Sequence, residues 1–362
     1  MTVPGSLVDW LRFTLIPGIG GETQRKLLTA FGLPEAVFAA GTEALSQTIG
    51  NKAARLLHAA DNRPAVERAL AWAASPGHRI VCLADADYPR SLLQIPDPPT
   101  LLYVVGRVEL LNQTAVAVVG SRNPTAQGIQ NAERFASSLT QAGLSITSGL
   151  ALGIDAAAHR GALTATGDTV AFIGTGIDRM YPAANHSLAR EIALRGAIVS
   201  EFPLGTPPAA ANFPRRNRLI SGLSRGVLVV EATVESGSLI SARLAAEQGR
   251  EVFAIPGSIH SPQSRGCHKL IKQGAKLVET VEDVLDELSW TVAPPGPESA
   301  ADQPEEANAL LQALGFDPCS LDELVGRSGL TTDVVSVMLL HLELDGRVAT
   351  LPGGRYQRIV LA

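Results

Sequence analysis

The hydrophobic pattern between residues 114 and 288 alternates short apolar runs with segments of helical period. Each run ends at glycine, proline, serine or another turn residue. The runs contain little polar alternation, which is typical of strands buried on both faces. This rhythm predicts a parallel sheet with helices on both of its faces. The predicted strands are residues 115–119, 144–147, 169–173, 197–200, 227–230 and 251–255, with a weaker one at 276–279.

The segments on either side of this sheet have different patterns. Residues 7–72 show several short helical patterns, and two strand-like runs separated by prolines, 79–83 and 101–105, indicate an extension at the sheet edge. Residues 291–308 are rich in proline, alanine and acidic residues without an apolar period, which predicts a flexible linker. Three short helices and a terminal hairpin over 309–362 are typical of a winged helix.

The predicted fold class is therefore α/β, with an extended, Rossmann-like, doubly wound and mostly parallel sheet. It is flanked by an N-terminal helical domain and a C-terminal winged helix. The predicted divisions are a helical domain at 1–75, a sheet domain at 76–290, a linker at 291–308 and a winged helix at 309–362.

One strand, glycine turn and helix start carry the first chemical signal. The run 115–119 ends at Gly120, and a polar helix opens at Pro124 and continues toward Gln141. Such a turn presents backbone N–H groups at a helix start, where the helix dipole favours an anion. Arg122 adds a planar fork suited to phosphate. The turn is thus predicted to bind phosphate.

The familiar nucleotide motifs are absent from this turn. A dinucleotide-binding turn reads G-x-G-x-x-G and is followed by an acidic residue at the second strand, whereas here that strand ends at Ser148 and Gly149. A P-loop of the form G-x-x-x-x-G-K-[ST] is absent as well. NAD and ATP are therefore poor candidates, and no cofactor is expected.

A basic segment is expected to complete the phosphate site. If the six main strands take the common order 3-2-1-4-5-6, the crevice lies between the ends of the first and fourth strands. The segment after the fourth strand contains Phe213, Pro214 and then Arg215, Arg216, Asn217 and Arg218, the densest basic cluster of the chain. Topology thus predicts that Arg122 and this cluster share one crevice. The alternative is that these arginines are solvated or pair with Glu201 and Glu231.

Other stretches offer weaker candidates. Tyr181, after Thr175 and Gly176, either stacks on a base or is merely packed. Ser236, Gly237 and Ser238 open a helix and either contact phosphate or form an ordinary cap. Asp155 and His159 have i,i+4 spacing, and this pair is interpreted as structural.

The N-terminal segment Ile16-Pro17-Gly18-Ile19-Gly20 before a helix is similar to a helix-hairpin-helix motif, with a weaker echo at Ile49 to Lys52. Such a hairpin either holds a DNA phosphate or is only a packing module.

Composition limits the classes of partner. The net charge of -5 leaves no global field for nucleic acid, so a DNA site must be a local patch. Residues 309–362 carry six acidic residues against four arginines, a net of -2, which favours partner docking over strong duplex binding. The separated Cys82, Cys267 and Cys319 form neither a metal nor a disulfide pattern and fit a reducing cytoplasm. No apolar run is long enough for a membrane span, and no signal peptide is expected.

Several long motifs resemble the DNA-processing protein A family (DprA, also called Smf). They are the GSR turn at 119–124, SGLALGIDAAAHRGAL at 148–163, GTGIDRMYP at 174–182, SEFPLGTPP at 200–208, FPRRNRLISGLS at 213–224, VVEA…SGSLISARLAAEQGREVFAIPGS at 229–258 and GCHKLIKQGA at 266–275. The resemblance covers the whole sheet domain and is highly specific. The N-terminal helices, similar to a SAM or helix-hairpin-helix domain, and the winged helix also fit this family.

The resemblance implies a non-catalytic protein that binds and protects single-stranded DNA, loads the recombinase RecA in natural transformation and forms a homodimer through its sheet domain. It places DNA contacts at Arg122 and at Arg215, Arg216 and Arg218, and a dimer surface near Ile255, Leu270 and Ile271. A lysine that some relatives carry after the Tyr-Pro is replaced here by Ala183, Ala184 and Asn185. No catalytic residue and no metal ligand are expected. The full set of expected DNA-binding residues is Gly120, Ser121, Arg122, Asn123, Ser148, Gly149, Thr175, Gly176, Tyr181, Asn185, Phe213, Arg215, Arg216, Asn217, Arg218, Ser236, Gly237 and Ser238.

The alternative is an enzyme of the phosphoribohydrolase type, which uses a similar sheet. Its P-G-G-x-G-T-x-x-E signature is missing from residues 231–238, although Glu201 and Glu231 remain candidate acid–base residues.

Overall fold

The computed structural model describes residues 6–291, 305–315, 318–344, 346–351 and 353–359. The chain divides into two compact units, residues 1–292 and 293–362. Most of the predicted linker, residues 292–304, lies outside the described residues, and its predicted end at 308 is wrong because a helix begins at Glu305.

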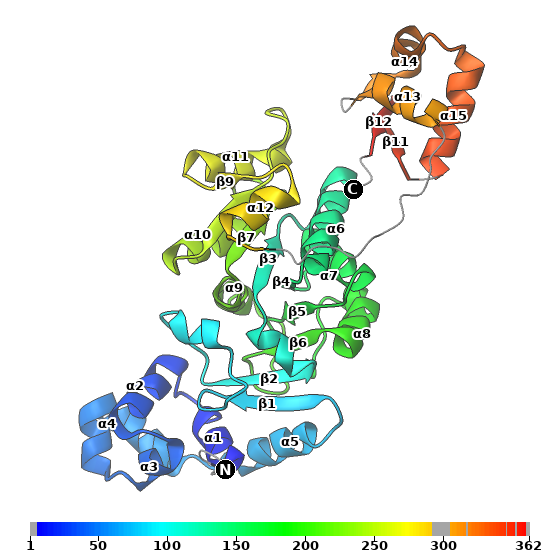
Figure 1. Cartoon of the computed structure of the whole chain (residues 1–362). Helices are drawn as coiled ribbons and strands as arrows, with labels where there is room; N and C mark the ends of the chain where they lie inside the picture. The colour runs from blue at the N-terminus through cyan, green and yellow to red at the C-terminus, as the bar shows by residue number, and fades with distance from the viewer. Residues whose placement is uncertain (1–5, 292–304, 316–317, 345, 352, 360–362) are drawn as a thin grey trace. The chain divides into compact units, whose positions relative to one another are not determined.

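The first unit is built on a nine-stranded sheet, which Figure 1 shows with its strands labelled. All pairs among strands β3 to β9 are parallel. At one edge β2 pairs antiparallel with β6, and β1 pairs antiparallel with β2. The predicted edge extension is therefore confirmed. The strands are β1 (His78–Cys82), β2 (Leu101–Gly106), β3 (Ala115–Val119), β4 (Ser145–Ser148), β5 (Thr169–Phe172), β6 (Ala197–Ser200), β7 (Gly226–Val229), β8 (Glu251–Ala254) and β9 (Lys276–Leu277).

The strand order differs from the assumed one. It runs β1-β2-β6-β5-β4-β3-β7-β8-β9, so the chain winds outward from β3 to β6 and then returns to place β7 beside β3. The assumption that the fourth main strand, β6, neighbours the first, β3, was wrong. The crevice of a doubly wound sheet lies where the winding reverses, and here that point is between the carboxyl ends of β3 and β7.

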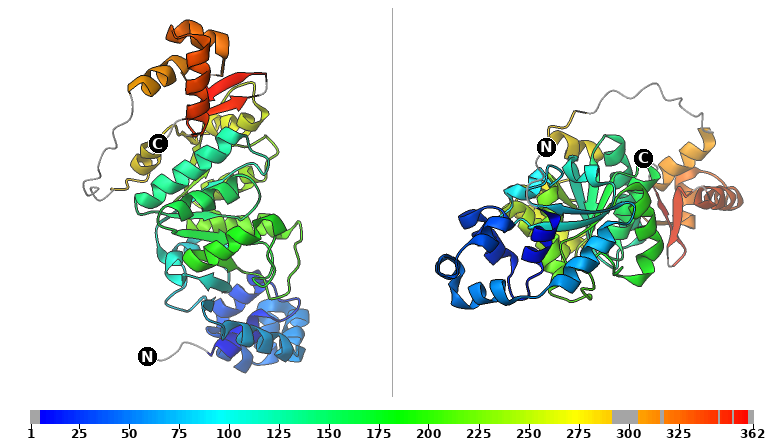
Figure 2. Two further views of the ribbon diagram at one scale, coloured as in Figure 1. Left: turned by 90° about the vertical axis from the view of Figure 1, so that its right-hand side faces the viewer. Right: turned by 90° about the horizontal axis from the view of Figure 1, so that it is seen from below.

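Helices cover both faces of the sheet, as the two further views in Figure 2 show. One apolar core lies under α9, α10 and α11, and others lie under α6, α7, α8 and α12. All five residues of β3 are buried, with Ala117 and Val119 in the first core and Val116 and Val118 in the second. The helices are α6 (Ala126–Gln141), α7 (Ile154–Thr164), α8 (His186–Arg195), α9 (Asn212–Leu223), α10 (Ser238–Glu247), α11 (Arg265–Lys272) and α12 (Val281–Glu287).

The N-terminal helices pack against the antiparallel edge of the sheet. Trp10 and Leu11 join the apolar core that contains Tyr103 of β2, while Phe13, Ile16 and Ile19 belong to a separate helical core. The second hairpin-like echo is a break inside α4, where Gly50 has φ +81°. The helices are α1 (Leu7–Thr14), α2 (Gly21–Phe31), α3 (Pro34–Ala39), α4 (Thr42–Ala59) and α5 (Arg63–Ala73).

The second unit has the predicted winged-helix arrangement of three helices and a small antiparallel sheet of order β10-β12-β11. Its core contains Leu310, Leu324, Val335 and Leu339. The elements are α13 (Glu305–Leu314), β10 (Cys319–Ser320), α14 (Leu321–Ser328), α15 (Thr332–Leu344), β11 (Val348–Leu351) and β12 (Arg355–Arg358). In the part of the chain that the structure describes, no helix is both long and apolar enough to cross a membrane.

Candidate nucleic-acid interface

A groove of about 770 Å³ opens at the carboxyl ends of β3 and β7, under the first turns of α9. It is the switch-point crevice of the sheet. The loop after β3, the loop before α10 and the start of α9 supply its walls. Eleven of the expected DNA-binding residues line it: Gly120, Ser121, Arg122, Asn123, Tyr181, Phe213, Arg216, Asn217, Ser236, Gly237 and Ser238.

The loop after β3, residues 120–125, is held by hydrogen bonds on both sides. The Ser121 amide donates to the carbonyl oxygen of Glu231 at 2.7 Å, and the Asn123 amide donates to Ser121 Oγ at 3.1 Å. The side-chain amide of Gln263 donates to the Asn123 carbonyl oxygen at 3.0 Å. The loop is therefore rigid before any ligand arrives, which lowers the entropic cost of binding.

The helix start behind this loop is already occupied by a carboxylate. Glu231 Oε2 accepts from the Thr125 amide at 2.9 Å, and Oε1 accepts from the Thr125 hydroxyl at 2.5 Å. Thr125 in turn caps the Gly128 amide at 3.0 Å. The expectation that these N–H groups are free for phosphate was thus wrong for Thr125 and Gly128. Glu231 takes the place at the helix dipole that an anion would otherwise fill.

Arg216 is a buried charge in the wall of the groove. Its side chain crosses Gly149, where a β-carbon would collide with the guanidinium and with the Asp155 carboxylate. Nη1 donates to the Phe172 carbonyl oxygen at 3.0 Å, and the residue is 4% exposed. Burial lowers the pKa of Arg216 to about 10 and raises the pKa of Asp155, while each opposite charge partly offsets the other's shift. Arg216 therefore stays charged at neutral pH.

Arg122 lies at the mouth of the same groove beside two aromatic rings. Its guanidinium carbon is 5.8 Å from the ring centre of Phe213, and the rings of Phe213 and Tyr181 are 5.7 Å apart at 41°. Arg122 is exposed and has no ion pair among the described residues. Tyr181 is 47% exposed. Together they offer a cation and a flat apolar surface to one ligand.

The basic cluster does not face the groove as a whole. It belongs to a helix, α9, and Arg215 and Arg218 point away from Arg216 into a second cavity. Arg218 Nη2 pairs with Glu201 Oε2 at 2.5 Å, and Arg215 Nε lies 3.2 Å from Glu201 Oε1. The prediction of one shared crevice was therefore wrong for Arg215 and Arg218, for which the alternative pairing with Glu201 is confirmed.

The remaining expected site residues do not line the groove, and they hold contacts within neighbouring loops. The Ser148 hydroxyl donates to the Val118 carbonyl oxygen at 2.7 Å, and the Thr175 hydroxyl donates to the Arg179 carbonyl oxygen at 2.5 Å. The side-chain amide of Asn185 donates to the carbonyl oxygens of Leu150 and Ala151 at 2.9 and 3.1 Å, which holds the loop after β4. Gly176 allows the close approach of residues 203–205.

The interpretation of Asp155 and His159 as a pair was wrong in detail. Asp155 Oδ2 accepts from the Ala151 amide at 3.4 Å, whereas His159 Nδ1 lies 2.7 Å from the Thr169 hydroxyl oxygen. That hydroxyl donates to the Ile146 carbonyl oxygen at 3.0 Å, so Nδ1 must carry the hydrogen that His159 donates. Both residues are structural, but they hold different contacts.

Sequence reasoning missed several residues of the groove wall, among them Asp155 and Gln263. Asp155 lies seven residues after the end of β4. Its place after the carboxyl end of a parallel strand was a signal that could have identified it as a groove residue. Gln263 reaches the loop after β3 across 140 residues, and no local pattern indicates this contact.

The groove is suited to an anion with a flat apolar part. Its lining residues include two arginines, Arg122 and Arg216, and one carboxylate, that of Asp155. In the described residues no group of three or more histidines, cysteines or carboxylates is arranged to hold a metal ion. A phosphate and a stacked base match this combination of charge and aromatic surface.

Comparison with known proteins agrees with the fold and the motifs. A family model described as DNA recombination-mediator protein A matches residues 79–289, and a DprA winged helix domain matches residues 293–354. Protein Smf of Escherichia coli is 43% identical over 301 residues, which cover 81% of this chain and 80% of that protein. Protein Smf of Synechocystis is 34% identical over 389 aligned positions, and the alignment covers 96% of this chain and 98% of that protein.

Two solved structures are also similar. DprA from Streptococcus pneumoniae has a TM-score of 0.69 at 38% identity, covering 77% of this chain and 97% of that one. DprA from Helicobacter pylori, reported for its single-stranded DNA binding mode, has a TM-score of 0.54 at 33% identity, covering 58% and 96%. On the motifs, the family model and these relatives together, the chain belongs to the DNA recombination-mediator protein A family, known as DprA or Smf.

Proposed function

We propose that this protein binds single-stranded DNA in the groove and delivers the strand to RecA during natural transformation and recombination, without catalysing a reaction. The observation that carries the proposal is the arrangement of Arg122, Phe213 and Tyr181 beside the buried charge of Arg216. The Helicobacter pylori relative, with its single-stranded DNA binding mode, supports the choice of ligand. A cytoplasmic location follows from this role.

The exposure of each side chain indicates its role in binding the strand. Arg122 is exposed and unpaired, so it meets a phosphate directly, and Tyr181 presents a ring on which a base stacks. Base stacking contributes roughly 1–3 kcal/mol for each base. Arg216 is buried and cannot follow a moving strand, so it acts by raising the potential inside the groove. Single strands fit because their bases are free to stack.

Substitution of Arg122 by alanine is expected to weaken oligo-dT binding by roughly tenfold, because one charge-assisted phosphate contact is lost. The slope of log affinity against log salt is expected to become shallower by about 0.7. Fluorescence anisotropy over a salt series measures both quantities. Arg190→Ala is the matched control, because Arg190 is also exposed but lies on α8 outside the groove. An unchanged slope for Arg122→Ala would contradict the proposal.

The enzyme alternative has less support in the geometry. Glu231 caps α6, and Glu201 is buried against Arg218, so neither proposed acid–base residue lines the groove. Asp155 does line it, but its carboxylate holds the loop after β4. Incubation with nucleoside monophosphates followed by chromatography distinguishes the two functions, since released base would identify a hydrolase.

The winged helix is proposed to dock RecA. Its helix α15 exposes Val334, Val337 and Leu340, which are 44%, 58% and 56% exposed, and its acidic balance disfavours duplex DNA. Deletion of residues 293–362 is expected to leave oligo-dT affinity within about twofold and to abolish RecA loading, measured as RecA filament formation on coated strands. Loss of strand binding in this variant would show that the groove is not the main DNA site.

A homodimer through the sheet domain is also proposed. Strand β9 ends the sheet, and its Leu277 is 41% exposed, so this edge is open to pairing with a second copy. Ile255 and Leu270, by contrast, are each only 9% exposed and belong mainly to the core of this chain.

A further inference from the structure

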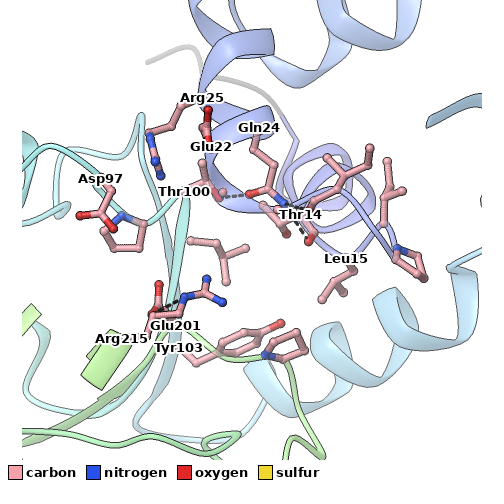
Figure 3. A pocket seen from close by; sticks show the side chains of 18 of the residues that line it. Thr14, Leu15, Glu22, Gln24, Arg25, Asp97, Thr100, Tyr103, Glu201 and Arg215 are labelled. Atoms are coloured by element: carbon pink, nitrogen blue, oxygen red, sulfur yellow. Dashed lines mark hydrogen bonds and ion pairs between the residues drawn. The ribbon is translucent and has the colours of Figure 1, made fainter. Parts of the chain in front are cut away.

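A second cavity, of about 810 Å³, lies between the start of α2 and the antiparallel edge of the sheet. Figure 3 shows Gln24 and Arg25 on one side of it and Tyr103, Glu201 and Arg215 on the other. The two sides are joined by a hydrogen bond of 2.6 Å from the Thr100 hydroxyl to Gln24 Oε1. The cavity is thus part of the folded unit, and its size suits a small ligand.

The charges around this cavity do not balance. Glu201 and Asp97 both pair with Arg218, and Glu201 also lies against Arg215. Arg25 donates only to the Pro98 carbonyl oxygen at 3.2 Å, and Arg68 on α5 has no hydrogen bond or ion pair among the described residues. Glu22 also lines the cavity, but its carboxylate pairs with Lys26 at 2.9 Å. Four arginines therefore line the cavity against three carboxylates, and Arg25 and Arg68 have no ion pair among the described residues, which favours an anionic ligand.

Two independent features point to where such a ligand would be held. The N-terminus of the 11-residue helix α2 has Gly20 as its N-cap and no side-chain cap, so backbone N–H groups are available at the wall. On the opposite side, the hydroxyl of Tyr103 has no hydrogen-bond partner although the residue is only 1% exposed. A buried hydroxyl without a partner is costly, and a ligand that accepts its hydrogen removes that cost.

We propose that this cavity binds one nucleotide unit, with its phosphate at the start of α2 and Arg68 and its base near Tyr103. The proposal rests on the proposed DNA binding in the groove, because helix α9 forms a wall of both sites. Phe213 and Arg216 line the groove, whereas Arg215 and Arg218 line the cavity. A strand that leaves the groove across the start of α9 meets Arg215 and then this second site.

The test compares short and long oligo-dT, about 4 and about 16 nucleotides, with three variants. Arg68→Ala is expected to weaken binding of the long strand five- to tenfold and to leave the short strand unchanged. Tyr103→Phe is expected to weaken the long strand two- to fivefold without lowering the Tm, because it removes an unpaired hydroxyl. Arg190→Ala serves as the surface control. The measurement is fluorescence anisotropy with each labelled strand.

The outcomes separate this inference from the proposed function. If Arg122→Ala weakens the binding of both the short and the long strand while Arg68→Ala affects neither, the proposal of a second site is overturned and the proposal for the groove stands. No effect of Arg122→Ala would instead contradict the groove. Binding of free dTMP that is lost in Arg68→Ala would show that the site takes a free nucleotide, whereas a long-strand effect without dTMP binding assigns it to the strand. A lower Tm for Tyr103→Phe would contradict the assignment of its hydroxyl to the ligand.

Discussion

Replacement of Arg216 by methionine is expected to lower the free energy of unfolding by about 3–5 kcal/mol, because it leaves the Asp155 carboxylate buried without its opposite charge. Asp155 is 8% exposed, and the Ala151 amide at 3.4 Å is then a main remaining stabilising contact. The same variant is expected to lose oligo-dT affinity, since the potential in the groove falls. Urea unfolding and fluorescence anisotropy measure the two effects.

A double variant tests whether the two charges act as a pair. Arg216→Met combined with Asp155→Asn removes both charges, so most of the stability is expected to return, and oligo-dT affinity is expected to recover with it because the net charge of the groove is restored. Burial already raises the pKa of Asp155, and loss of Arg216 raises it further. Asp155 then keeps its proton to a higher pH in the folded protein than in the unfolded chain. The loss of stability in the single variant should therefore become smaller toward acidic pH. This account would be contradicted if the loss of unfolding free energy in Arg216→Met were independent of pH. It would also be contradicted if the double variant did not recover that stability.

Acidification from pH 7 to pH 3 is expected to remove roughly 4–5 kcal/mol of stability through His159 alone. Complete burial, helped by the charge of Arg216, lowers the pKa of His159 to about 3. The unfolded chain takes up this proton near pH 6.5 and the folded protein does not, so stability falls as pH drops through that interval. The slope is about 1.4 kcal/mol for each pH unit.

His159→Gln is expected to remove this part of the pH dependence between pH 6.5 and pH 3. The substitution also loses the 2.7 Å contact with Thr169, so the variant is less stable at pH 7 but has a flatter profile. His260→Gln is the control, because His260 is exposed in the loop after β8. Denaturant unfolding at several pH values gives the profile. An identical slope for His159→Gln and the unaltered protein would show that His159 is not the group responsible.

Local patterns were sufficient for most of the elements. The run 115–119 appears as expected, and the helix predicted to open at Pro124 begins at Ala126 and ends at Gln141, because a buried strand and an amphipathic helix each have a local signature. The three helices and the hairpin of the winged helix were predicted for the same reason. The motifs also placed Arg122 in the loop after the first strand of the switch point.

The contacts between these elements were harder to predict. Glu231 lies 106 residues from Thr125, and nothing in either segment indicates that one caps the other. The three arginines at 215, 216 and 218 look alike in the sequence, yet α9 turns Arg216 toward the groove and Arg215 and Arg218 toward Glu201. Which side of a helix is buried depends on the elements that pack against it.

The sequence by itself determined the α/β class, the winged helix, the family and the two arginine-bearing segments, because all of these depend on short-range order along the chain. Only the tertiary structure decided that β7 and not β6 lies beside β3, and that Arg216 lines the same groove as Arg122 while Arg215 and Arg218 line a second cavity. Strand order and helix orientation are set by which apolar surfaces are buried together over long separations, and that choice has no local signature.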